Sequence, residues 1–231
     1  MKSRQEIKAI GKERFKANYW NCVLAILFVG IIIAVVSGIG SLGASGSIED
    51  GDYQPGPLNG VMSLISFIVT GPLTIGLAGF FVQNIYGNKD ITAAYPIVSC
   101  KDNFGRKLGG FLWMELFIYL WSLLLVVPGI IKALSYSMTP YILSDCPNVK
   151  ARDALKLSMR MMAGHKGELF VFYLSYIGWG ILTAITFGIL GIFYVEPYMT
   201  SAGAVWYLEC REDALRRGVI TMGQLEGIEP V

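Results

Sequence analysis

The chain has 231 residues, of which 54% are hydrophobic and only 16% are charged. A soluble domain usually carries about 25% charged residues because its surface must be solvated. The composition therefore excludes an ordinary soluble domain and favours an integral membrane protein. The formal net charge is only +2, so the positions of the charges along the chain are more informative than their sum. No nucleic-acid partner is expected.

The first apolar run, residues 20–40, follows a basic segment that holds six Lys or Arg residues. Ser3 followed by Glu6 predicts a capping box that starts a helix in this segment. A cleaved signal peptide is the alternative interpretation, with the small residues 41–46 as its cleavage site. Because the apolar run is longer than the roughly 7–15 residues of a signal peptide, we expect a retained span.

Five further apolar runs follow. A helix needs roughly 20 mainly apolar residues to cross a bilayer, and the runs that we assign to spans are 60–82, 109–127, 130–146, 168–187 and 189–209. Proline lacks a backbone donor and interrupts helices, so we expect breaks at Pro72, Pro128, Pro140 and Pro197. The sequence thus predicts an all-α fold, a polytopic membrane protein with six transmembrane helices arranged as three helical hairpins.

The basic residues give the expected orientation. If the N-terminus is cytoplasmic, 18 of the 19 Lys and Arg residues fall on the cytoplasmic side, and the exception is Lys132. The connection 41–59 then lies outside and holds acidic residues but no Lys or Arg. A single crossing over 110–146 would instead put the basic residues of 150–166 outside, against the positive-inside rule. Both termini are therefore expected in the cytoplasm.

Residues 151–162 have the pattern of an amphipathic helix that lies in the headgroup plane, with apolar side chains on one face and cations opposite. Each cation near an anionic leaflet contributes about 1 kcal/mol of attraction. We predict that the residues facing lipid headgroups are Arg152, Lys156, Arg160 and Lys166. The only histidine, His165, lies in the turn that follows, where we expect a structural or lipid-facing role, with catalysis as the alternative.

Ionisable residues within spans are candidate functional groups, because each costs about 2.5–3.5 kcal/mol to insert at a helix centre. The candidates are Lys132, Glu196 and Glu115. Lys132 and Glu196 are expected at comparable depth, where they would pair, either to tie two hairpins together or to form a substrate or ion site. Glu115 either extends to the inner interface beside Arg106 and Lys107 or has a functional role.

The chain is expected to form a single membrane domain, 1–231, and the recurrence of an interfacial helix followed by a helical hairpin suggests three repeat units. These units would be 1–88, 89–148 and 149–217, with chance similarity among apolar segments as the alternative. Gly30, Ala34 and Gly38 recur every fourth residue, a pattern that lets transmembrane helices approach closely.

The cysteines indicate no metal or redox site. No two of the four are spaced as C-x-x-C, so we predict neither a zinc site nor a redox pair. All four fall at or near cytoplasmic ends of spans, where thiols stay reduced. They are Cys22, Cys100, Cys146 and Cys210.

Four segments carry a family resemblance: "VPGIIKALSYSMTPYIL", "ARDALKLSMRMMAGHKGELF", "GW…TFGIL" and "EPYMTSAGAVWY". In this order they resemble the domain-of-unknown-function 975 family of bacterial multi-span membrane proteins, found mostly in Gram-positive bacteria. The resemblance covers nearly the whole chain and is densest over 109–209. It implies a multi-pass protein of the bacterial cytoplasmic membrane and supplies no established reaction.

No catalytic motif stands out. The sequence has no H-E-x-x-H, no glycine-rich phosphate loop opening a helix and one histidine, so neither an enzyme nor a cofactor or metal is expected. We expect a non-enzymatic membrane protein that engages lipids of the anionic leaflet, a protein partner or a second copy of itself. The alternative is a small transporter or channel with a polar site at the broken helices, and a membrane-embedded enzyme is a third hypothesis.

Overall fold

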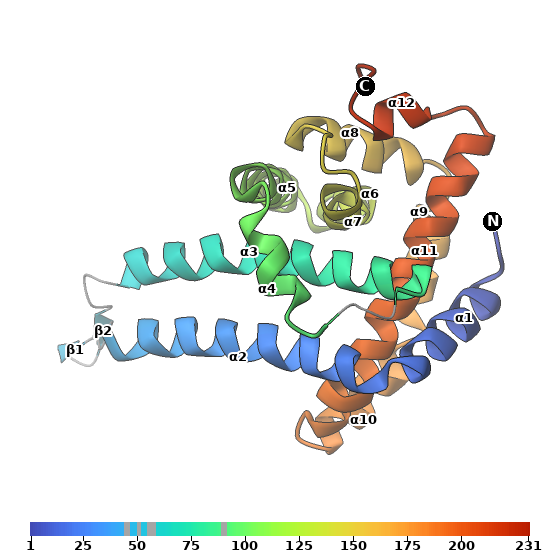
Figure 1. Ribbon diagram of the computed structural model, residues 1–231. Helices are drawn as coiled ribbons and strands as arrows, with labels where there is room; N and C mark the ends of the chain where they lie inside the picture. The colour runs from blue at the N-terminus through green and yellow to red at the C-terminus, as the bar shows by residue number, and fades with distance from the viewer. Residues whose placement is uncertain (44–46, 50–51, 55–58, 89–91) are drawn as a thin grey trace.

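The computed structural model describes residues 1–43, 47–49, 52–54, 59–88 and 92–231 (Figure 1). This part of the chain is almost wholly helical, which confirms the all-α prediction. One short β-hairpin is present, in which β1 (Ser47–Glu49) pairs antiparallel with β2 (Asp52–Gln54). The capping box predicted from Ser3 and Glu6 starts the first helix, with the Glu6 amide donating to Ser3 Oγ at 3.3 Å.

The helices follow one another with short connections. In chain order they are α1 (Arg4–Ala17), α2 (Tyr19–Gly43), α3 (Asn59–Tyr86), α4 (Tyr95–Lys101), α5 (Phe104–Leu124), α6 (Val126–Tyr136), α7 (Thr139–Asp145), α8 (Ala151–Met161), α9 (Lys166–Leu174), α10 (Ile177–Ile185), the π-helical turn η1 (Gly191–Val195), α11 (Glu196–Arg216) and α12 (Met222–Leu225).

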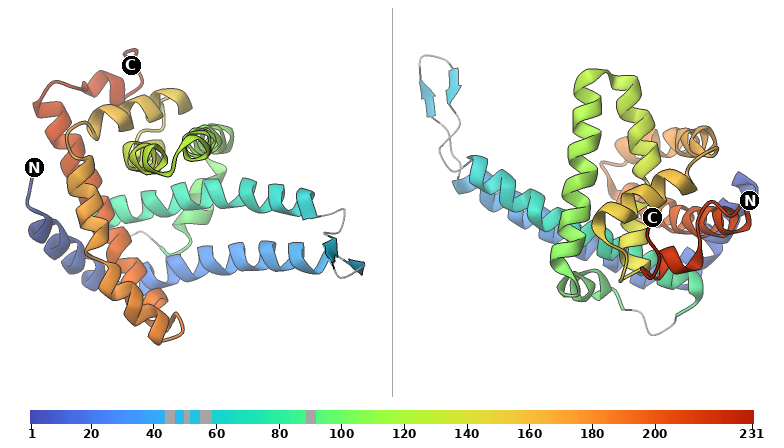
Figure 2. Two further views of the ribbon diagram at one scale, coloured as in Figure 1. Left: turned by 180° about the vertical axis from the view of Figure 1, so that it is seen from behind. Right: turned by 90° about the horizontal axis from the view of Figure 1, so that it is seen from above.

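The long helices form three pairs that diverge from a shared core (Figures 1 and 2). The pairs are α2 with α3, α5 with α6, and α9–α10 with η1–α11. An aromatic contact connects the two halves of the third pair: the ring centroids of Phe172 in α9 and Trp206 in α11 lie 5.1 Å apart. The three pairs run in different directions (Figure 2).

Four helical segments in the described part of the chain are long and apolar enough to cross a membrane, rather than the six predicted. They are Tyr19–Gly38, Ser63–Tyr86, Phe104–Leu124 and Lys166–Ile185. The predicted span 130–146 fails because α6 ends at Tyr136 and α7 has only seven residues. At 1.5 Å per residue, the 11 residues of α6 reach about 17 Å, well short of a hydrocarbon core about 30 Å thick.

The predicted span 189–209 fails for a different reason. It falls on η1 and α11, and α11 is enclosed by protein, with twelve buried residues among its 21. Protein neighbours accept small and polar side chains such as Ala202, Ser201 and Glu209, all of which are buried. A helix enclosed in this way does not need the continuous apolar surface that lipid demands.

The four prolines do not all interrupt helices. Pro72 lies inside α3, which continues to Tyr86, so the predicted break there is wrong. The hydroxyls of Thr70 and Thr74 donate to the backbone carbonyls of Ser66 and Gly71 in the same helix. The other prolines fall in first turns, where a missing N–H has no cost. They are Pro128 in α6, Pro140 in α7 and Pro197 in α11.

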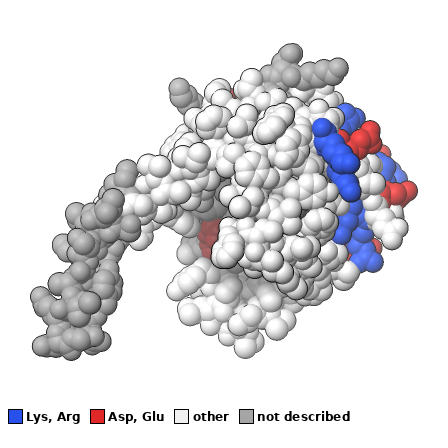
Figure 3. All heavy atoms as spheres, turned by 90° about the horizontal axis from the view of Figure 1, so that it is seen from below, with Lys and Arg blue, Asp and Glu red and all other residues white. Residues whose placement is uncertain are grey.

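Apolar side chains are exposed at the tips of the helix pairs. Leu123 and Val126 are each 71% exposed where α5 turns into α6, and Phe187 is 97% exposed after α10. Contiguous exposed apolar surface marks contact with lipid or with another protein. Seen from below, the Lys and Arg side chains and several Asp and Glu side chains lie along one edge, a further acidic group lies in a recess nearer the middle, and most of the other described surface of that face is uncharged (Figure 3).

A close helix contact ties the N-terminal helix to the core. A Cβ built on Gly11 of α1 would lie 2.6 Å from the Cα of Ala202 in α11, and the Ser201 hydroxyl donates to the Gly11 carbonyl at 2.9 Å. By contrast, a Cβ on Gly30 would meet no atom within 4 Å. At Gly30, therefore, α2 makes no close helix contact of the kind that its row of small residues predicted.

Candidate functional site

A row of aromatic rings extends from α5 to α6. Trp113 and Phe117, one helical turn apart on α5, stack with ring centroids 5.7 Å apart. The Phe117 ring lies 6.4 Å from the ring of Tyr136, the last residue of α6. The antiparallel return of α6 thus brings Tyr136 back alongside the middle of α5 and completes the row.

A cation lies at each end of this row. The Arg152 guanidinium lies over the Trp113 ring at 4.5 Å. The Lys132 amino group lies 5.0 Å from the Trp121 ring and 5.8 Å from the Tyr136 ring. Cation–π contacts of this kind are worth about 0.5–1 kcal/mol when exposed and about 2 kcal/mol when desolvated. They hold both cations against the aromatic surface.

Beside the row lies a hollow of about 350 Å³, here named the aromatic hollow. It is bounded by α5, the end of α6 and α8. Its lining residues are Trp113, Phe117, Tyr136, Arg152, Leu155, Lys156 and Met159. Burial raises the pKa of the Tyr136 phenol, which therefore stays neutral at pH 7. The described lining of the hollow thus combines an apolar wall with two cations and includes no carboxylate.

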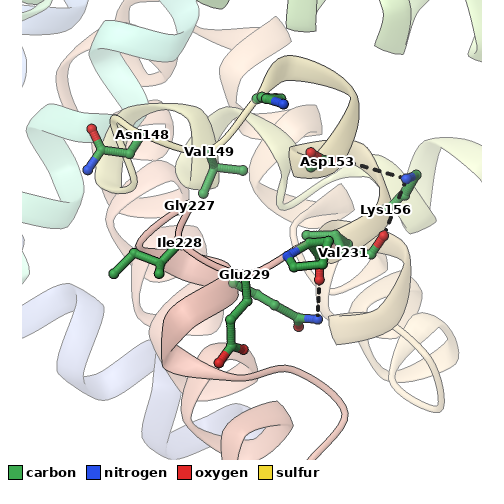
Figure 4. A pocket seen from close by; sticks show the side chains of 11 residues that line it. Asn148, Val149, Asp153, Lys156, Gly227, Ile228, Glu229 and Val231 are labelled. Carbon is green, nitrogen blue, oxygen red and sulfur yellow. Dashed lines mark hydrogen bonds and ion pairs between the residues drawn. The ribbon is translucent and has the colours of Figure 1, made fainter.

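A second hollow of about 380 Å³, here named the polar hollow, adjoins the first (Figure 4). It lies between α8 and the C-terminal segment, and its lining residues are Asn148, Val149, Lys150, Asp153, Lys156, Gln224, Gly227, Ile228, Glu229, Pro230 and Val231. Lys156 lines both hollows. Its amino group lies 3.3 Å from Asp153 Oδ1 and donates to the Val231 carbonyl at 3.4 Å.

Two sets of contacts hold the segments around α8 in place. Arg106 donates to the carbonyls of Leu143, Cys146 and Val149 at 2.5–3.2 Å, which fastens the end of α7 and the following loop to α5. On the C-terminal side, Gly227 has φ +73° and approaches Asn148 so closely that an added Cβ would lie 2.6 Å from its carbonyl oxygen. A residue with a side chain would push the C-terminal segment away from α8.

The four basic residues predicted to face lipid headgroups divide into two groups. Arg152 and Lys156 are exposed and line the aromatic hollow. Arg160 and Lys166 are half-buried and line neither hollow.

The predicted Lys132–Glu196 pair is not formed. Lys132 lies on aromatic rings, as described above, while Glu196 is exposed at the start of α11 and makes no ion pair within the described residues. The expectation of comparable depth assumed parallel helix pairs, and the pairs diverge. Glu115 is half-buried on α5 and does not line either hollow.

His165 belongs to an ion-pair cluster rather than to either hollow. Its Nε2 lies 3.0 Å from Asp213 Oδ2, and Arg217 Nε lies 2.7 Å from the same oxygen. Burial opposes ionisation of Asp213, but the hydrogen bond from His165 and the charge of Arg217 lower the pKa of this carboxyl. The cluster joins the start of α9 to the end of α11, which favours the structural role expected for His165.

The aromatic members of the site were not singled out from the sequence. The available signal was the spacing of Trp113, Phe117 and Trp121, which recur every fourth residue and share one face of α5. Tyr136 carried no such signal, because only the fold brings α6 back against α5. Within the described residues, no group of three His, Cys, Asp or Glu side chains is placed to hold a metal ion.

The family model described as protein of unknown function (DUF975) matches residues 1–135 and 123–214. The chain belongs to this family. The DUF975 matches include all the lining residues of the aromatic hollow, whereas Gln224 and residues 227–231 of the polar hollow lie beyond them. No curated protein and no solved structure matches the chain.

Proposed function

We propose that this DUF975 protein is a non-enzymatic protein of the bacterial cytoplasmic membrane that binds an anionic lipid in the aromatic hollow. The observation that carries the proposal is the pairing of an apolar wall with Arg152 and Lys156 at its rim. Acyl chains pack against Trp113, Phe117 and Met159, while the phosphate lies beside the two cations. Basic pockets between membrane helices are a recurrent form of lipid recognition.

The position of the hollow supports a lipid ligand. One wall is α5, which is long and apolar enough to span a membrane, and the side chains beyond Phe117 on this helix, such as Leu120, are exposed. A lipid therefore reaches the hollow along the surface of α5 without leaving an apolar environment. A soluble anion has no apolar part that could pack against the apolar wall.

The proposed orientation, with both termini cytoplasmic, rests on the charge pattern and on one feature of the fold. Because α6 returns antiparallel to α5, α8 lies beside the N-terminal half of α5, and Arg152 meets Trp113. The cations of α8 therefore lie on the same side as Arg106, near the start of α5. This gathering of cations suits the anionic cytoplasmic leaflet.

The transport hypothesis lacks a comparable observation. It needs a polar site where helices break, and the two charged residues expected there, Lys132 and Glu196, make no ion pair with each other. A protein partner and a second copy of the chain remain predictions.

The test measures binding of short-chain phosphatidylglycerol to protein in an uncharged detergent, with phosphatidylcholine as the comparison lipid. The double substitution Arg152→Gln with Lys156→Gln removes two cations of about 1 kcal/mol each and is expected to weaken phosphatidylglycerol binding about 30-fold. The matched control removes the two cations outside the hollow, through Arg160→Gln with Lys166→Gln, and is expected to leave binding unchanged. Equal losses in both double variants would overturn the proposal in favour of diffuse surface attraction.

A further inference from the structure

The proposed function places the acyl chains and the phosphate of the lipid at the aromatic hollow and assigns nothing to the polar hollow. The two hollows adjoin, because Lys156 lines both of them. We infer that it receives the headgroup of the bound lipid, and that this headgroup is an uncharged polyhydroxyl group such as glycerol. This inference rests on the proposed function, since it assigns the part of the lipid that lies beyond the phosphate.

The geometry of α8 sets the path of the lipid. At 100° per residue, Leu155, Lys156 and Asp153 follow one another around the helix, so the aromatic hollow, the shared cation and the polar hollow lie in that order. A phosphate beside Lys156 therefore has its acyl chains on one side of the helix and its headgroup on the other.

The charges of the polar hollow favour an uncharged headgroup. The side chains that line the hollow include two cations, Lys150 and Lys156, and two carboxylates, Asp153 and Glu229. Both carboxylates already have partners, because Asp153 pairs with Lys156 and Glu229 accepts from the Thr221 hydroxyl. A further phosphate would meet the carboxylates, and an ammonium group would meet an exposed Lys150.

The free polar groups of the hollow suit hydroxyls. Asn148 is exposed, lines the hollow and makes no side-chain hydrogen bond in the described part of the chain, and the same holds for Lys150. An amide supplies both donors and an acceptor, and an ammonium supplies three donors. Hydroxyls donate and accept, so a polyol satisfies both residues, whereas an apolar headgroup would leave them unsatisfied.

The decisive experiment compares two lipids of equal charge in uncharged detergent, short-chain phosphatidylglycerol and phosphatidylpropanol, by native mass spectrometry of the full chain. They share one phosphate and a three-carbon headgroup and differ only in the two hydroxyls. Two net hydrogen bonds of about 1 kcal/mol each predict about a 30-fold preference of the wild-type protein for phosphatidylglycerol. Asn148→Leu with Lys150→Met is expected to abolish this preference without weakening phosphatidylpropanol binding.

The outcomes separate this inference from the function on which it rests. Equal binding of both lipids by the wild-type protein would overturn the polyol assignment while binding of an anionic lipid stands. Tighter binding of phosphatidylethanolamine than of phosphatidylglycerol would overturn the preference for an anionic lipid, and with it the proposed function. Binding of none of these lipids would overturn the proposed function itself. A preference that persists in the Asn148 and Lys150 double variant would place the headgroup outside the polar hollow and refute the inference.

Discussion

The contact between α1 and α11 gives a sharp test of the fold. Replacing Gly11 by Ala places a Cβ 2.6 Å from Ala202 Cα and 2.8 Å from Ala202 N, and both are backbone atoms that a side-chain rotation cannot move. The helices must separate, which stretches the bond from Ser201 to the Gly11 carbonyl. Overpacking costs about 1–3 kcal/mol, and alanine offsets about 0.5–1 kcal/mol of this through its helix propensity. The net destabilisation of the docked α1 is about 1–2 kcal/mol.

The assay is trypsin cleavage within residues 1–17, where Lys and Arg residues recur. When helix opening is fast relative to cleavage, the cleavage rate follows the population of the open helix. A change of 1–2 kcal/mol therefore raises the rate about 5–30-fold. Glu13→Ala is the matched control, because Glu13 is exposed on the same helix and its loss removes no trypsin site. An unchanged or lower rate for Gly11→Ala, compared with this control, would refute the close contact.

Two further predictions concern titratable groups. Burial opposes ionisation of Glu209, but two hydrogen bonds from Lys2 lower the pKa of this carboxyl. The stabilisation from this carboxylate is therefore fully present above the unfolded pKa of about 4.3 and is lost as the pH falls from there through the lower pKa of the folded state. Amide exchange protection over residues 1–17 should fall across that range, and protection that persists below it would contradict this. Burial raises the pKa of the Cys146 thiol to about 11 and that of Cys210 to about 12. Variants that retain one of these cysteines should react slowly with maleimide at pH 7 until unfolded, whereas rapid labelling of the folded protein would show that the thiol is not buried.

Local chemistry could be predicted from the sequence. The capping box of Ser3 and Glu6, the helical class and the apolar character of four spans all follow from residue patterns within a few turns. The unpaired state of Cys22, Cys146 and Cys210 agrees with their lack of motif spacing, and the side chain of Cys100 lies outside the described residues. The acidic residues of 41–59 also have side chains outside the described part, and the relation among the three repeat units remains a prediction.

What the sequence could not supply was the choice between lipid and protein as the neighbour of each helix. Residues 189–209 suggested a span, but the neighbours of α11 are protein side chains, and twelve of its residues are buried. Similarly, Arg152 and Arg160 fall on the same basic helix, and only the position of Trp113 separates them. The direction in which each helix pair leaves the core decides both matters, and no local pattern encodes it.

The pairing of α1 with α11 also has a consequence for the order of synthesis. Ser201 and Gly11 are 190 residues apart, so α1 leaves the ribosome long before the helix that covers it exists. During that interval Ile7 and Phe15, which are fully buried in the finished protein, lack the cover of α11. The last long helix of the chain therefore completes the burial of the first one, and α1 reaches its final environment only at the end of synthesis.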